Sequence, residues 1–166
     1  MNTADIPNLV ERVHKFNAEG QIVPPGHFNA ERVAFYTGMQ LEELAEKLRA
    51  IAEGHVVEND RMELQGLAHF MDTFGKQFKA GKHYGAVLRA DREELLDGDI
   101  DQLVVSVGSM IYSTPKFAGA IAAVLDANDA KRWPDGTFHH DANGKITKPQ
   151  GWIAPDLTPF IDPPID

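Results

Sequence analysis

The chain has 166 residues, no cysteine and a formal net charge of −9, and 43% of its residues are hydrophobic. This length and balance fit one globular domain with a real core. The negative charge argues against a nucleic-acid polymer as partner, because backbone phosphates require clustered Lys and Arg. Without cysteine there is no disulfide, thiolate metal site or cysteine nucleophile, which fits a cytoplasmic protein.

The N-terminal region predicts neither export nor membrane insertion. It carries Asp5 and has no long apolar run, so we expect no signal peptide. No stretch of the chain approaches the roughly 20 apolar residues that a membrane helix requires. We therefore expect no membrane partner.

Three helices are predicted in the first half of the chain. Asp5 can cap a helix over residues 5–19, and Asn29 can cap a second helix that runs to about Glu53. A third helix is expected near residues 60–79. In the second helix, the apolar spacing of three and four predicts a core stripe of Thr37, Leu41, Leu44, Leu48 and Ile51.

Two further helices are predicted in the second half. A loop starting at Ala80 precedes a fourth helix over about 92–112, which Asp91 can cap, and a fifth helix covers 115–130. Most sides of the fourth helix are apolar, through Leu96, Ile100, Leu103, Val104, Val105, Val107, Ile111 and Tyr112. A helix of this kind is usually central and buried.

After Arg132 the turn-forming residues rule out long helices. Asn143-Gly144 is a hairpin-turn signal, which predicts a short hairpin around 137–146. We expect an all-α fold, a bundle of four or five helices. Residues 1–132 would form the helical catalytic domain, and residues 133–166 an extended C-terminal arm of the same domain.

Two acidic stretches lie on separate predicted helices. In the second helix, Glu42, Glu43 and Glu46 cover about one third of the circumference at about 100° per residue. In the fourth helix, Glu94 and Asp97 are three residues apart and share a face. Such faces are commonly solvated, so a helical interaction module with solvated acidic faces stays open as an alternative.

Both acidic patches continue into apolar surface, which favours sheltered carboxylates. The arc of the second helix runs back to Met39 and Phe35, and the stripe of the fourth continues to Val105 and Tyr112. Sheltered carboxylates repel one another and would protonate without a counter-charge. We therefore predict that the two helices face each other and hold a divalent metal ion. All-oxygen ligation suits Mg²⁺ or Mn²⁺.

A metal held by carboxylates indicates a class of chemistry. Mg²⁺ can bridge phosphate oxygens and lower the pKa of a bound water. No serine or cysteine nucleophile stands out, so attack by water on a phosphoanhydride is favoured. A di-iron or di-manganese bundle would need Glu-x-x-His pairs, but Arg49 follows Glu46 and Asp97 follows Glu94 at that spacing.

The motifs resemble those of a known family. Glu-Glu-x-x-Glu at 42–46, followed by Glu-x-x-Asp at 94–97, resembles the all-α nucleoside triphosphate pyrophosphohydrolases, the MazG-like superfamily. The C-terminal region resembles its phosphoribosyl-ATP-pyrophosphohydrolase-like branch, which has members in phages and bacteria. The segments that carry this second likeness are Asn128–Lys131, Pro134–Gly136, Asn143–Lys145, Lys148–Gly151 and Pro155–Leu157.

The resemblance implies hydrolysis of a nucleoside triphosphate between its α and β phosphates, giving the monophosphate and pyrophosphate. Carried over by motif, the metal ligands would be Glu43, Glu46, Glu94 and Asp97, with Glu43 also catalytic. Glu42 would be a further ligand or would orient the attacking water. The residues that would approach the phosphates or sugar are Asn128, Lys131 and Lys148.

The resemblance leaves the substrate and the assembly partly open. It points to deoxynucleotides, with dGTP as one candidate, and to a homodimer or homotetramer. Hydrolysis of phosphoribosyl-ATP is the alternative within the family. The long link over 54–91 departs from the family pattern. A loose basic run near the fourth helix could receive the triphosphate tail, but we interpret it as a solvated loop; it consists of Lys76, Lys79, Lys82, Arg89 and Arg92. Trp152 could either stack on a base or anchor the tail.

Overall fold

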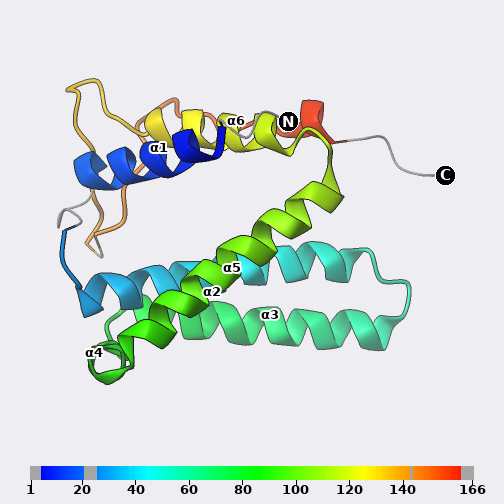
Figure 1. Cartoon of the computed structure of the whole chain (residues 1–166). Helices are drawn as coiled ribbons and strands as arrows, with labels where there is room; N and C mark the ends of the chain where they lie inside the picture. The colour runs from blue at the N-terminus through cyan, green and yellow to red at the C-terminus, as the bar shows by residue number, and fades with distance from the viewer. Residues whose placement is uncertain (1–4, 21–25, 143, 162–166) are drawn as a thin grey trace. The chain divides into compact units, whose positions relative to one another are not determined.

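The structure is a computed structural model that describes residues 5–20, 26–142 and 144–161 (Figure 1). In chain order, the helices of the described residues are α1 (Asp5–Gly20), α2 (Ala30–Glu53), α3 (Glu58–Lys79), α4 (Tyr84–Arg89), α5 (Arg92–Ser113), α6 (Phe117–Asp129) and the 3₁₀ turn η1 (Thr158–Phe160). The all-α prediction is confirmed, with the C-terminal arm following α6. The six-residue α4 lies in the predicted loop and is too short to produce a periodic signal.

Contacts divide the chain into two units. One unit contains residues 27–95, and the other contains residues 1–26 together with 96–166. The first unit therefore holds α2, α3, α4 and the first turn of α5. The second unit holds α1, the rest of α5, α6 and the arm.

In the first unit, α2 and α3 form a helical hairpin whose seam is made of small residues (Figure 1). The buried small residues that recur at seven-residue intervals are Gly38, Ala45 and Ala52 in α2, and Ala68 and Gly75 in α3. A Cβ atom added to Gly38 would lie 2.6 Å from the Gly75 carbonyl oxygen, and the reverse distance is also 2.6 Å. The two backbones therefore touch at this pair of glycines, and the seven-residue spacing sets Ala45 opposite Ala68.

The predicted core stripe of α2 is correct only in part, because Thr37, Leu41 and Leu48 are partly buried but Leu44 and Ile51 are exposed. Leu44 is 38% exposed and Ile51 is 47% exposed, whereas Ala45 and Ala52 are fully buried. The close approach of the two backbones explains the difference, because only residues with little or no side chain fit between them. The larger residues flank the seam.

A second cluster joins α4 and the start of α5 to α2. Ala30, Ala34 and Val87 are buried there, and Phe78 and Leu95 pack against them. The caps predicted for α2 and α5 are present. Asn29 accepts a hydrogen bond from the Arg32 amide at 3.0 Å, and Asp91 accepts one from the Glu93 amide at 2.8 Å.

The second unit is stabilised by side chains that contact residues far away in the sequence. Arg12 of α1 pairs with Asp126 and Asp129 of α6, at 2.8 and 2.7 Å. The Thr114 hydroxyl donates to the Phe160 carbonyl at 2.5 Å, which ties η1 to the start of α6. These contacts hold the arm against the helices of its own unit.

The predicted hairpin over 137–146 is present in a reduced form. His140 and Ile146 make an isolated antiparallel bridge, and the Thr147 amide donates to the His139 carbonyl at 2.8 Å. Gly144 has a φ of 75°, the left-handed backbone that favours glycine in a turn. Asn143, the other residue of the predicted turn, lies outside the described residues.

Helix α5 differs from the prediction that it is central and buried. None of its residues is buried in the single chain; Val105 is 67% exposed and Tyr112 is 94% exposed. Periodicity indicates which side chains avoid water, but not whether the surface that covers them belongs to the same chain. Within the described ranges, no helix is both long and apolar enough to cross a membrane.

Candidate functional site

Glu42 lies on the seam between α2 and α3, where it pairs with Lys79. The Lys79 ammonium donates to Glu42 Oε2 at 2.6 Å, and the two side chains are only 19% and 17% exposed. Helical side chains lean toward the N-terminus of their helix. Each stem therefore passes over the glycine of the facing helix, so the pair depends on Gly38 and Gly75.

Glu43 and Glu46 occupy a different environment on the same helix. Both are exposed, and the residue between them on the buried side is Ala45. The prediction of at least some sheltered carboxylates therefore holds for Glu42 in this stretch. Glu43 and Glu46 present their carboxylates to solvent.

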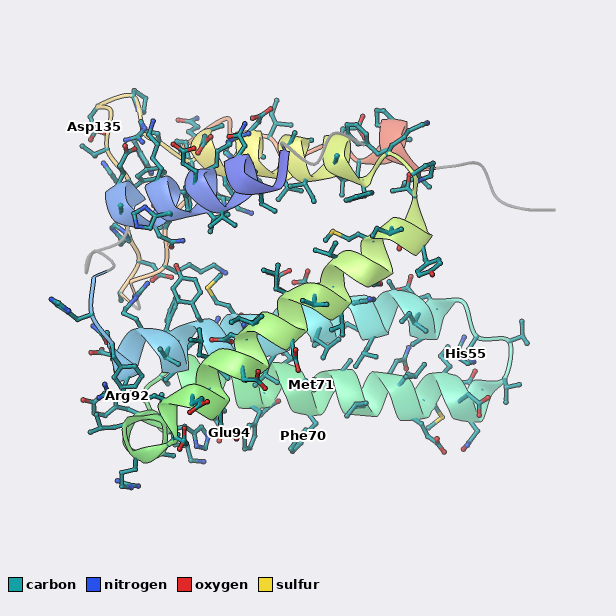
Figure 2. All side chains as sticks on the ribbon, in the orientation of Figure 1. His55, Phe70, Met71, Arg92, Glu94 and Asp135 are labelled. Atoms are coloured by element: carbon teal, nitrogen blue, oxygen red, sulfur yellow. The ribbon has the colours of Figure 1, made fainter. Side chains whose placement is uncertain are left out.

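Glu94 and Asp97 occupy consecutive turns at the start of α5, and both are exposed (Figure 2 labels Glu94). The position of this first turn within its unit is fixed by Leu95, which packs on the Ala30 cluster. Arg92 contributes as well, because its guanidinium lies 4.2 Å from the centre of the Phe28 ring. Glu94 belongs to the 27–95 unit, and Asp97 to the other.

The predicted metal ligands do not form a cluster in the described part of the chain. No group of three or more His, Asp or Glu side chains comes together there as a metal site. The chemistry of the donor set still fits, since Glu43, Glu46, Glu94 and Asp97 are carboxylates and hard divalent cations prefer oxygen ligands. The magnesium or manganese site stays a prediction.

The three predicted substrate-binding residues, by contrast, gather at one place. Lys131 donates to the Asn128 side-chain oxygen at 2.7 Å. The ammonium groups of Lys131 and Lys148 lie 5.9 and 4.2 Å from the centre of the Trp152 ring. Two ammonium groups thus lie near one indole, and the Asn128 side chain is bonded to one of them.

Trp152 has a structural role in this cluster. Its Nε1 hydrogen is donated to the Ala127 carbonyl of α6 at 2.8 Å. The ring is partly buried between the arm and the helix. The structure thus favours the tail-anchor interpretation of Trp152, and both Lys131 and Lys148 lie near the anchored ring.

Sequence reasoning missed the environment of Lys79. The interpretation of this residue as part of a solvated loop is wrong, because Lys79 ends α3 and is largely buried against Glu42. One signal was available. Each member of the pair follows a glycine by four residues, Gly38 for Glu42 and Gly75 for Lys79. The sequence alone, however, does not indicate that these two glycines face each other.

Compared with models of protein families, with curated proteins and with solved structures, the chain matches none. The fold and the side-chain clusters define an all-α protein in two units. Half-buried and exposed carboxylates lie on α2 and α5, and a lysine-bearing cluster lies on α6 and the arm. Its activity is inferred from these residues.

Proposed function

We propose that this protein is a Mg²⁺- or Mn²⁺-dependent nucleoside triphosphate pyrophosphohydrolase of the MazG-like superfamily, in its phosphoribosyl-ATP-pyrophosphohydrolase-like branch. It would convert a nucleoside triphosphate and water into the monophosphate and pyrophosphate. One observation carries the proposal, and it concerns the three residues that the family pattern assigns to phosphate or sugar: Lys131 donates a hydrogen bond to Asn128, and Lys131 and Lys148 both lie near the Trp152 ring. Ammonium and amide donors in one patch suit a polyanionic ligand.

The acidic residues would supply the metal chemistry. Glu43, Glu46, Glu94 and Asp97 would hold the divalent ion, which when bound neutralises phosphate charge and lowers the pKa of a bound water. Their exposure leaves their oxygens accessible to an ion from solvent. The same exposure is what a solvated acidic face would show, so a non-enzymatic interaction module is the competing outcome.

The substrate is inferred from the family pattern. We propose a deoxynucleoside triphosphate, with dGTP as a candidate, and phosphoribosyl-ATP as the alternative substrate. The contacts of the Trp152 cluster do not identify a base, and the indole Nε1 hydrogen is already donated to the Ala127 carbonyl. The site of action would be the cytoplasm.

Exposed apolar surface supports a homodimer or homotetramer. On α5 the exposed large residues include Leu96, Ile100, Leu103, Val104 and Val105, and on the α2–α3 hairpin they include Leu44, Ile51, Met62, Leu67 and Phe70 (Figure 2 labels Phe70). Monomeric proteins rarely expose large contiguous apolar patches. A second copy would cover apolar side chains on one or both of these elements, and sedimentation of the purified protein gives the number of copies.

Product analysis tests the proposal directly. The protein is incubated with each nucleoside and deoxynucleoside triphosphate and Mg²⁺ or Mn²⁺, and the products are identified by ³¹P NMR. Monophosphate with pyrophosphate is expected. Glu46→Gln should lower turnover by about 100-fold or more while the circular dichroism spectrum is unchanged. Glu53→Gln, an exposed carboxylate at the end of the same helix, is the control. Orthophosphate alone, or no metal-dependent turnover, would contradict the proposal.

A further inference from the structure

The Glu42–Lys79 pair is unusual among the ion pairs of the described residues, because both partners are largely shielded. The comparable pair of Lys76 with Asp72 spans one turn of α3, and the Lys76 side chain is 66% exposed. The Lys79 pair instead joins two helices and spans 37 residues of sequence. A long side chain loses considerable rotamer entropy when it is buried in this way, so the contact needs strong geometric support.

Two glycines provide that support. The space where a Gly38 Cβ would stand is 2.7 Å from Lys79 Cγ, so the lysine stem occupies the room left by the missing side chain. The space at Gly75 is likewise 3.1 Å from Glu42 Cγ. Each stem crosses the glycine of the facing helix. The seam therefore fixes the direction of the Glu42 carboxylate, whereas Glu43 and Glu46 are exposed.

The charge of Lys79 also bears on which cations Glu42 can bind. Its ammonium lies 2.6 Å from Glu42 Oε2. A divalent cation at that oxygen would be placed against a positive charge, and the repulsion is weakly screened at a shielded site. The second carboxylate oxygen of Glu42 can still accept a hydrogen bond from water.

We infer that Lys79 is a positioning residue that holds Glu42 on the α2–α3 seam, so that Glu42 orients the attacking water and is not a metal ligand. This inference rests on the proposed pyrophosphohydrolase function, and it decides between the two roles that the motif left open for Glu42. In the step, the water oxygen bonds to one of the two phosphorus atoms that flank the α–β bridging oxygen. The bond from that phosphorus to the bridging oxygen breaks, and the water proton leaves through the Glu42 carboxylate to solvent.

A set of variants tests the inference. Lys79→Met keeps an unbranched stem over Gly38 but removes the ammonium, and Lys79→Arg retains a cation. Lys76→Met, in the same final turns of α3, removes a lysine that pairs with Asp72 and does not contact Glu42. Each is compared with Glu42→Gln and with the double variant. The measurements are kcat, KM, the Mn²⁺ dissociation constant and the melting temperature.

The expected results separate positioning from a merely structural role. Lys79→Met should lower kcat by about 100-fold, because a misplaced reacting group costs roughly this factor. Its KM and Mn²⁺ dissociation constant should stay within about threefold of wild type, and Lys79→Arg should recover most of the lost kcat. Because Lys79 acts through Glu42, the double variant should be no slower than Glu42→Gln. Lys76→Met should behave as wild type.

If the wild-type protein hydrolyses nucleotides, any of three results would overturn the inference and leave the proposed function intact. One is a wild-type kcat for the folded fraction of Lys79→Met. Another is a multiplicative loss in the double variant. A third is a Mn²⁺ affinity that Glu42→Gln weakens as strongly as Glu46→Gln does. A wild-type protein that hydrolyses no nucleotide overturns the proposed function, and the inference with it.

Discussion

The two units of this chain differ in the contacts that stabilise each of them internally. The α2–α3 hairpin is packed by residues with little or no side chain, and its tightest point is the backbone contact between Gly38 and Gly75. The unit of α1, α6 and the arm is tied by long side chains such as Arg12 and Trp152. The first unit should therefore be sensitive to added atoms, and the second to removed ones.

This difference matters for the two groups of candidate residues, one in each unit, because each depends on the packing of its own unit. The Glu42 carboxylate is directed by the close helix seam. The cluster of Asn128, Lys131 and Lys148 instead depends on an arm anchored through the indole of Trp152. Geometry set by packed helices is generally more precise than geometry set by an anchored loop.

The largest stability effect is expected from adding one methyl group to the seam. In Gly75→Ala the new Cβ would meet the Gly38 carbonyl oxygen at 2.6 Å, and backbone cannot move aside cheaply. We expect a loss of about 1–3 kcal/mol in the free energy of unfolding, typical of overpacking. Urea denaturation measures the loss.

The control for this prediction lies on the same helix. Gly66 has nothing within 4 Å of its absent Cβ, so Gly66→Ala should stabilise the protein by up to about 1 kcal/mol through helix propensity. The two substitutions make the same chemical change with opposite expected signs. Equal effects would show that the Gly38–Gly75 contact does not determine the packing of the hairpin.

A smaller effect is expected from removing the anchor of the second unit. Trp152→Ala deletes the hydrogen bond to the Ala127 carbonyl and the ring beneath Lys148. We expect a loss of about 1–2 kcal/mol, together with faster proteolysis of the arm. Trp152→Phe keeps a smaller aromatic ring and loses the Nε1 donor, so its effect should lie between wild type and Trp152→Ala. Mass spectrometry of the cleavage products locates the change, and cleavage within α2 or α3 first would contradict the prediction.

Much of the fold was predictable because its signals are local. Asn29 and Asp91 cap the helices that were assigned to them, since a cap depends only on the next three residues. The core of α2 was not predictable in the same way. Leu44 and Ile51 satisfy helical periodicity, but the seam selected Ala45 and Ala52, and that choice depends on how closely a second helix approaches.

The candidate site follows the same pattern. The sites at Asn128, Lys131 and Lys148 were predicted from motif resemblance, and Asn128 and Lys131 are only three residues apart in the sequence. The partnership of Lys79 with Glu42 needed the register between two helices. No local pattern encodes that register, because it is set by the meeting of Gly38 with Gly75.

The smallest effect concerns the response of the arm to acid. Asp135, in the loop after α6 (Figure 2), has its pKa lowered from 3.8 to about 2, first by the Thr137 amide and then by His139 and the Thr137 hydroxyl. The ionised carboxylate is thus favoured in the folded state. Its stabilising contribution is present above pH 3.8 and is lost as pH falls toward 2. In Asp135→Asn the unfolding free energy should therefore change less between pH 4 and pH 2 than in wild type. Urea denaturation across this range measures the slope, and NMR titration of Asp135 gives its pKa. Parallel slopes, or a carboxylate that titrates near 3.8, would show that the Asp135 turn does not favour the ionised form.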